Sequence, residues 1–165
     1  MKGRLENEIK REQYISAMLN DLPDYVNDWH LNLKASNKTA ATRCDFLTKI
    51  RRFLYSINDI PKFVTTRQIT EDVVISYFIS CQRKETKDGI ETTSSSYQRG
   101  VYNCLNNFLG FLSRRGEIPT NYMQDITKPK DIDKERVNRN RILLTEKDFQ
   151  NILDAVEDNT RTRLI

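Results

Sequence analysis

The chain lacks the features that mark secreted, membrane and metal-binding proteins. It has no long apolar run and no signal-like apolar segment after Met1, so we expect neither a membrane span nor secretion. Its three cysteines, Cys44, Cys81 and Cys104, are odd in number and widely spaced, which suits reduced thiols rather than a disulfide framework or a zinc site. The single histidine, His30, has no second histidine with which to share a metal ion. We therefore expect a cytoplasmic protein without metal, cofactor or small-molecule substrate, in which His30 has a structural or surface role.

Glycine and proline are also scarce, with five and four residues among 165. Alternating runs of β-branched residues are few, whereas Leu, Lys, Arg, Glu and Asn are common, so the composition favours helices over sheets. A hydrophobic fraction of 38% allows one modest core, with room for a linker and a fragment of something else. These features predict an all-α protein built on a small bundle of four to five helices.

Apolar residues recur at helical spacing in several segments. A first core helix is predicted over 23–33 and a second over 37–57, with Asn37 or Thr39 as the N-cap of the second. A third helix is expected after Thr70, and a fourth over 94–115, ended by Gly116. The apolar stripes of the first two helices are Leu22, Val26, Trp29 and Leu33, then Phe46, Ile50, Phe53, Leu54 and Ile57.

The remaining segments suggest how the chain is divided. Residues 83–93 are polar and contain Asp88 and Gly89, a pair typical of a turn. The segment 119–144 has no sustained period, holds two prolines and is rich in charge, which predicts an extended linker. A new apolar stripe follows Thr145 with little chain left to bury it, as expected for the first helix of a truncated second domain. We therefore expect an N-terminal helical extension over 1–20, a domain over 21–118, a linker over 119–144 and the start of another domain over 145–165.

The stretch from Thr92 to Gly116 contains no acidic residue. A solvated helix face usually pairs Glu with Lys, whereas this helix offers hydroxyls, amides and Arg, and Gly100 and Gly110 permit close approach. Such a face suits contact with DNA. The expected buried residues are Val101, Leu105, Phe108, Leu109 and Leu112, and the expected polar face consists of Ser96, Arg99, Asn103, Asn106, Asn107 and Gly110.

Positive charge is concentrated in three segments. Residues 38–52 carry a net charge of +4, and residues 92–116 and 127–141 carry +3 each, although the whole chain carries only +4. The rest of the chain is therefore acidic. Segregation of this kind is typical of a protein that grips a polyanion along selected elements, although solvated helices can also cluster charge by chance.

The order of these segments resembles the core-binding domain of tyrosine recombinases, the family of phage integrases and Xer-like enzymes. One signature of the family is a turn that corresponds to residues 116–121 here. Proline usually follows this turn in the family, whereas Tyr122 follows it in this chain. The resemblance rests on the 23–33 helix, the 37–57 helix opening with SNKTAATR, the 94–115 helix, the turn GEIPTN over 116–121, the linker residues Lys128, Pro129 and Lys130, and the segment LTEKDFQNIL.

The resemblance implies a helical half-clamp around duplex DNA in a protein of DNA integration and recombination, often carried by phages or mobile elements. Family members cleave and rejoin DNA through a tyrosine nucleophile assisted by Arg, Lys and His side chains. The resemblance places these residues beyond Ile165, so neither Arg161, Arg163 nor any tyrosine here is assigned a catalytic role. The implied partners are double-stranded DNA and other recombinase subunits, which form a tetramer on DNA, and the implied location is the nucleoid. The chain alone should bind DNA without cutting it.

The resemblance also implies that the 37–57 and 94–115 helices face the major groove. From the 37–57 helix, the expected phosphate and groove contacts are Lys38, Thr39, Thr42, Arg43, Lys49 and Arg52. From the 94–115 helix, Ser95 and Ser96 are expected on phosphate, and Arg99, Asn103 and Asn106 at base edges, since Arg pairs with guanine and Asn with adenine through two bonds each. Lys128, Lys130, Arg139 and Arg141 are expected to follow the DNA backbone.

Two other functions fit the same residues. One is a complete, non-catalytic helical regulator that binds DNA, in which residues 145–165 fold back onto the bundle. The other is a protein-interaction bundle that uses residues 1–20 and the third helix. In the second case DNA binding would be sensitive to salt and blind to sequence.

Overall fold

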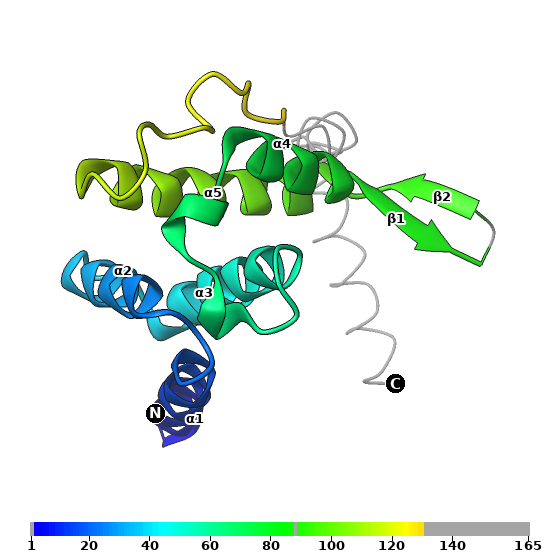
Figure 1. The fold of residues 1–165 in the computed structure, drawn as a ribbon. Helices are drawn as coiled ribbons and strands as arrows, with labels where there is room; N and C mark the ends of the chain where they lie inside the picture. Colours follow the sequence, from blue (N-terminus) through cyan, green and yellow to red (C-terminus); the bar gives the residue numbers. More distant parts are fainter. Residues whose placement is uncertain (1, 88, 131–165) are drawn as a thin grey trace, which may run out of the picture. The chain divides into compact units, whose positions relative to one another are not determined.

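Helices dominate the computed structural model, which describes residues 2–87 and 89–130 and the side chains from residue 6 onward (Figure 1). Within these residues there are five α-helices, two short 3-10 turns and one β-hairpin, so the predicted small helical bundle is confirmed. The elements are α1 (Lys2–Leu19), α2 (Asp24–Ala35), α3 (Ala40–Tyr55), η1 (Pro61–Phe63), η2 (Thr66–Gln68), α4 (Glu71–Ser80), β1 (Arg83–Thr86), β2 (Gly89–Thr92) and α5 (Ser95–Arg114). No helix in this described part is long and apolar enough to cross a bilayer.

Side-chain caps fix where the helices begin. The Oγ1 atom of Thr39 accepts a hydrogen bond from the Thr42 amide at 3.3 Å, so Thr39 rather than Asn37 is the N-cap of α3. Asn37 instead adopts a φ of +56°, in the left-handed region that Asn tolerates better than most residues. Ser94 caps α5 in the same way, through the amide of Tyr97 at 3.3 Å.

Gly116 ends α5, as the sequence predicts. Its φ is +71°, and its amide donates to the Ser113 carbonyl at 3.0 Å, while the Glu117 amide donates to the Leu112 carbonyl at 3.0 Å. This pair of bonds satisfies two carbonyls that the end of the helix would otherwise leave open. The chain is thereby turned back, and Ile118 is buried.

The core forms where the predicted stripes meet. Trp29 is fully buried, stacks on Phe46 with ring centroids 6.1 Å apart, and meets the edge of Phe108 at 5.0 Å. The stripe from Leu22 to Leu33 and the stripe of α5 are all buried. On α3 Leu47 joins the buried set while Phe46 is only partly buried, as is Ile57 just beyond the end of the helix. α1 contributes Ile15 and Met18 to this core, so its second half belongs to the bundle.

The chain continues to pack beyond α5. Met123 is fully buried, and the Asn121 side chain donates to Oδ1 of Asn106 at 2.7 Å. The buried core therefore extends past residue 118, where the sequence suggested that the domain ends. Residues 119–130 contain neither helix nor strand. The rest of the predicted linker and the predicted helix after Thr145 lie outside the described residues.

A β-hairpin occupies the segment predicted to be a polar turn. β1 and β2 pair antiparallel, with Arg83 opposite Thr92, Lys84 opposite Glu91 and Glu85 opposite Ile90. Adjacent charged residues in β1 leave no alternation of polar and apolar side chains, which is the usual sequence signal of a strand. The hairpin projects away from the helices (Figure 1), and Thr86 alone among its described strand residues is partly buried.

Candidate nucleic-acid interface

α3 and α5 pack side by side and run in opposite directions. The Cys104 thiol donates to the carbonyl oxygen of Phe46 at 3.3 Å, and a side chain at Gly100 would place its Cβ 3.4 Å from Cε of Lys49. One turn further along α3, Arg52 lines the same cleft as Tyr97 of α5. The C-terminal half of α3 therefore lies beside the N-terminal half of α5, and we call the outer surface of these two helices the α3–α5 surface.

The polar face of α5 contains most of its predicted DNA contacts. Ser96, Arg99, Asn103 and Asn106 are spaced so that they share one side of a helix. Ser96 and Asn103 are exposed, whereas Arg99 and Asn106 are partly buried. The Asn106 side chain is engaged by Asn121, so it is less free to meet a base than Asn103. Ser95, which begins the helix, is also partly buried.

Two basic residues of α3 lie next to the first half of α5. Arg52 is exposed, whereas the side chain of Lys49 retains only 14% exposure and forms an ion pair with Asp45 one turn earlier. Asp45 is the acidic residue nearest to this part of α3 in sequence, and it offsets the charge of Lys49. Arg52 is therefore more accessible than Lys49 for the phosphate contact predicted from the sequence.

The start of α3 forms a separate group at the other end of the helix. Lys38 and Thr39 are exposed, and Thr42 is partly buried with its hydroxyl 3.0 Å from that of Thr39. From Thr39 to Arg52 the helix rises about 20 Å, because each residue advances about 1.5 Å. The predicted contacts of α3 are thus brought together at two points along its length rather than in one patch.

Arg43 belongs inside the bundle and not to the predicted DNA surface. It is only 5% exposed, and its guanidinium forms a bidentate ion pair with Glu12 of α1. The same group donates to Nε2 of His30 at 2.9 Å and to the Lys38 carbonyl at 3.1 Å. Because every arm of the guanidinium is engaged, this Arg joins α1, α2 and α3 and is not placed to contact DNA as the sequence predicted.

The environment of this network shifts two protonation equilibria. The hydrogen bond from Arg43 lowers the pKa of the Glu12 carboxyl below its usual 4.5. Burial, followed by the nearby guanidinium charge, lowers the pKa of His30 below its usual 6.5. Since an Arg side chain only donates, the neutral His30 ring accepts at Nε2 and carries its proton on Nδ1. Of the structural or surface role that the sequence suggested for His30, the structure therefore favours the structural one.

Asn107 was expected on the polar face of α5, and the structure gives it an internal partner. Its Oδ1 atom accepts a hydrogen bond from Nε1 of Trp29 at 2.9 Å. The N–H group of a buried indole needs a hydrogen-bond acceptor, so a Trp at the centre of the core indicates that some polar side chain or carbonyl lies next to it. The pairing itself could not be read from two positions in different helices.

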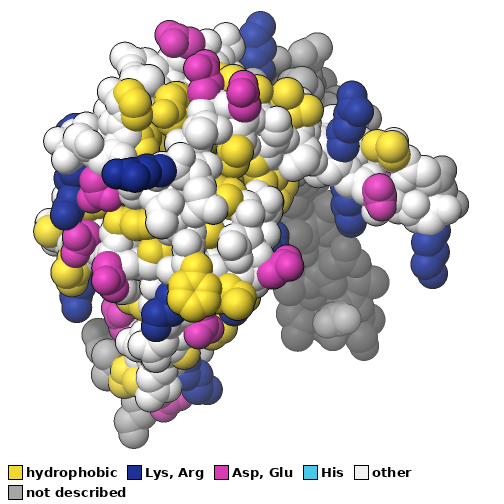
Figure 2. All heavy atoms as spheres, viewed as in Figure 1, with side chains coloured by type: hydrophobic (Ala, Val, Ile, Leu, Met, Phe, Trp, Pro, Cys, Tyr) yellow, Lys and Arg dark blue, Asp and Glu magenta, His cyan; other side chains and the backbone are white. Residues whose placement is uncertain are grey.

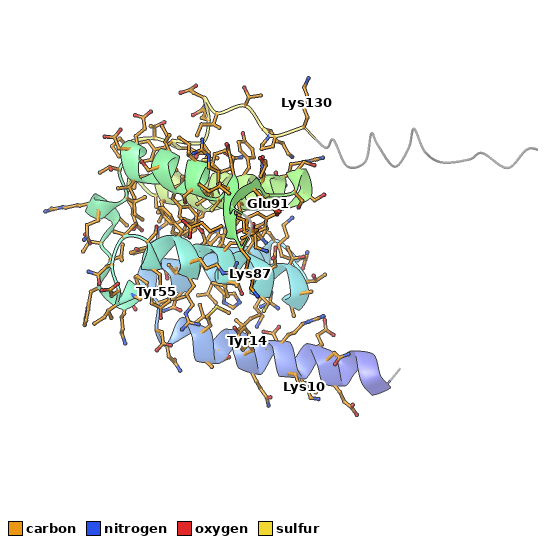
Figure 3. The ribbon with its side chains drawn as sticks, turned by 90° about the vertical axis from the view of Figure 1, so that its right-hand side faces the viewer. Lys10, Tyr14, Tyr55, Lys87, Glu91 and Lys130 are labelled. Atoms are coloured by element: carbon orange, nitrogen blue, oxygen red, sulfur yellow. The ribbon has the colours of Figure 1, made fainter. Side chains whose placement is uncertain are left out.

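The remaining predicted contacts follow α5. Lys128 and Lys130 are exposed, and the stick view shows Lys130 pointing outward at the end of the described chain (Figure 3). Arg139 and Arg141 lie outside the described residues. Within the described residues, no group of three or more His, Cys, Asp or Glu side chains is placed to hold a metal ion.

The described surface therefore combines hydroxyls, amides and guanidinium groups suited to phosphates and base edges. We compared the chain with protein-family models, with curated proteins and with solved structures, and it matches none of them.

Proposed function

We propose that this chain binds duplex DNA, with the α3–α5 surface facing the major groove. The observation that carries the proposal is the face of α5, where Ser96, Arg99 and Asn103 share one side of a helix without a single carboxylate. A major groove admits one α-helix, and Arg and Asn are the side chains that read guanine and adenine with paired hydrogen bonds. Arg99 and Asn103 are the base-reading residues in this proposal.

Phosphate contacts flank the reading residues in this proposal. Arg52 and Ser96 contact the backbone near the start of α5, and Lys38 and Thr39 contact it at the start of α3. The two groups on α3 lie about 20 Å apart. That separation matches about six base pairs of duplex, at about 3.4 Å per base pair.

We further propose that the chain is the core-binding part of a tyrosine recombinase. The helix order and the turn after α5 support this proposal, because the confirmed elements coincide with the segments that resemble the family. In this view the chain positions DNA in the nucleoid for a catalytic domain, and assembly with other recombinase subunits takes place on DNA.

A fluorescence anisotropy titration tests DNA binding. The chain should first be used to select preferred sequences from random duplexes, and affinity for the selected and unrelated duplexes should then be measured over a range of salt. Replacing Arg99 by Ala should weaken binding to the selected duplex by about 1 to 3 kcal/mol and relax the preference at one position. Replacing Arg52 by Ala should weaken all duplexes equally and reduce the salt slope by about 1.

The matched control is Lys10→Ala. This exposed Lys lies on α1, which Figure 3 shows along the opposite side of the bundle from α5. The variant removes the same charge as Arg52→Ala, so an equal loss of affinity would mean that binding depends on net charge alone. Unchanged affinity and unchanged preference after Arg99→Ala would contradict the assignment of α5 as the reading helix.

Docking of another protein is a second candidate function, favoured by exposed apolar side chains on α1. Ile9 and Tyr14 are 51% and 53% exposed, and Tyr14 is labelled on this helix in Figure 3. If this were the main function, DNA binding would show no sequence preference in the selection experiment. Replacing both residues with Ser would then leave weak DNA binding intact.

A further inference from the structure

A cleft of about 670 Å³ opens where the hairpin leaves the bundle. It is bordered by Arg52 of α3, by Tyr77 of α4 and by Tyr97 of α5, with Arg83 and Lys84 of β1 on the hairpin side. The cleft adjoins the α3–α5 surface because Arg52 belongs to both. No residue of the hairpin was among the contacts predicted from the sequence.

Charge in the cleft is unbalanced. Among its lining residues, Arg52, Arg83 and Lys84 are cationic and only Glu91 is acidic. Burial raises the pKa of the Tyr77 hydroxyl and of the Cys81 thiol, so neither side chain adds negative charge at neutral pH. The cleft therefore presents an excess of positive charge on a partly apolar floor.

The hairpin is firmly joined to the helices at this point. The Thr93 amide donates to the Gln82 carbonyl at 2.9 Å, and the Thr93 hydroxyl donates to the Cys81 carbonyl at 2.8 Å. The Gln98 side chain donates to the Thr93 carbonyl at 3.0 Å. These bonds hold β1 in a defined position next to α5, so the cleft is part of the fold.

The strands themselves contribute almost nothing to the core. Both faces of the hairpin are open, and Ile90 is 69% exposed. The space-filling view shows Lys and Arg side chains on several sides of the hairpin, with an acidic and a hydrophobic side chain between them (Figure 2). A two-stranded ribbon with no apolar face to bury is marginally stable alone. Burial of apolar side chains therefore does not explain why the chain forms this hairpin.

We propose that this cleft binds the sugar-phosphate backbone of one strand of the duplex, with Arg83 and Lys84 as phosphate ligands that extend the contact beyond α5. The inference rests on the proposed DNA binding. Arg52 supplies continuity, since a backbone that follows the α3–α5 surface past this residue enters the cleft. An acidic peptide shares the charge but lacks that continuity, so DNA is the occupant that the arrangement favours.

The test compares variants of the whole chain in the anisotropy titration and in phosphate ethylation interference. Arg83→Ala combined with Lys84→Ala should weaken binding to every duplex and lower the salt slope by about 2, because two phosphate contacts are lost. Interference by ethyl groups should disappear at phosphates on one edge of the protected region. Thermal unfolding of this variant should be unchanged, since both side chains are exposed.

Two further variants sharpen the comparison. Lys87→Ala removes a cation from the turn of the same hairpin, outside the cleft lining, and should leave the salt slope and the interference pattern as they are (Figure 3). Glu91→Gln removes the carboxylate that lies opposite Lys84 and should strengthen binding to all duplexes. Weaker binding by the double variant and stronger binding by Glu91→Gln would together locate the phosphate in the cleft, because Lys84 and Glu91 are paired across the hairpin.

The outcomes separate this inference from the proposed function. Reduced binding by Arg99→Ala, together with an unchanged slope for the Arg83 and Lys84 double variant, would overturn the cleft assignment alone. An equal loss of affinity per charge removed by the double variant and by Lys87→Ala would also overturn it. Failure of the unmodified chain to bind any duplex would remove both proposals. Poly-glutamate that displaces duplex from the unmodified chain but not from the double variant would assign the cleft to an acidic peptide and overturn its assignment to DNA.

Discussion

The indole of Trp29 donates its hydrogen to the side-chain oxygen of Asn107, across a distance of 2.9 Å. Trp29 lies at the centre of the core, whereas Asn107 is an exposed residue of α5. Together with the buried stripe of α5, the bond helps to set the rotation of α5 relative to α2. That rotation determines which amides of α5 face outward.

Asn107→Leu should lower the free energy of unfolding by about 1 to 3 kcal/mol, because it leaves a buried N–H group without an acceptor. Asn103→Leu is the matched control, since it changes an exposed Asn in the same helix and should alter stability by less than about 0.5 kcal/mol. Urea unfolding measures both. Equal stability of the two variants would mean that the Trp29 bond does not contribute.

Replacing Arg43 by Leu should also destabilise the bundle, by about 1 to 3 kcal/mol, because charged hydrogen bonds to α1 and α2 are lost. Arg52→Leu should leave stability nearly unchanged but reduce DNA affinity. Arg43→Lys should not restore stability, because an ammonium group cannot make the bidentate contact with Glu12. Full stability of the Lys variant would contradict the structural role of this guanidinium.

Stability should decrease as pH falls, in two steps. The folded chain holds the pKa of His30 below 6.5 and that of Glu12 below 4.5, so the unfolded chain takes up protons first at each group. Unfolding is therefore favoured below about pH 6.5 by His30, and further below about pH 4.5 by Glu12. The free energy of unfolding, measured with urea across this pH range, should fall less steeply below about pH 6.5 for His30→Gln. For Glu12→Gln it should fall less steeply below about pH 4.5. Stability that rises on acidification would contradict this account.

Two glycine substitutions should have opposite effects. Gly100→Ala should stabilise α5 by about 0.5 to 1 kcal/mol, since alanine favours helix and the new Cβ meets only the flexible Lys49 side chain at 3.4 Å. Gly116→Ala should destabilise by about 1 kcal/mol, because a φ of +71° is unfavourable for alanine. Thermal unfolding compares them. Reduced DNA affinity in Gly100→Ala would mean that DNA approaches this position more closely than we propose.

Much of the fold could be predicted because local rules agree with the packing. The stripe from Leu22 to Leu33 is buried, Thr70 caps α4, and Gly116 ends α5, each through a signal contained in a few neighbouring residues. Charge and composition also identified the polar face of α5. These features depend on helix periodicity and on the conformational preferences of single residues.

Other features depend on partners distant in sequence. Arg43 belongs to the same basic segment as Arg52. Only the position of Glu12 on another helix shows that the charge of Arg43 is paired inside the bundle. The hairpin was missed because Arg83, Lys84 and Glu85 lack the alternation that marks a half-buried strand. Local patterns could not reveal either arrangement.

The short connection between β2 and α5 couples the orientation of the hairpin to that of the helix. Only Thr93 and Ser94 separate the two elements, and Thr93 is bonded on one side to Gln82 and on the other to Gln98. A partner that tilts the hairpin must break these bonds or turn the first residues of α5 with it. The hairpin and the opening turn of α5 are therefore mechanically joined, so that the orientation of one constrains that of the other.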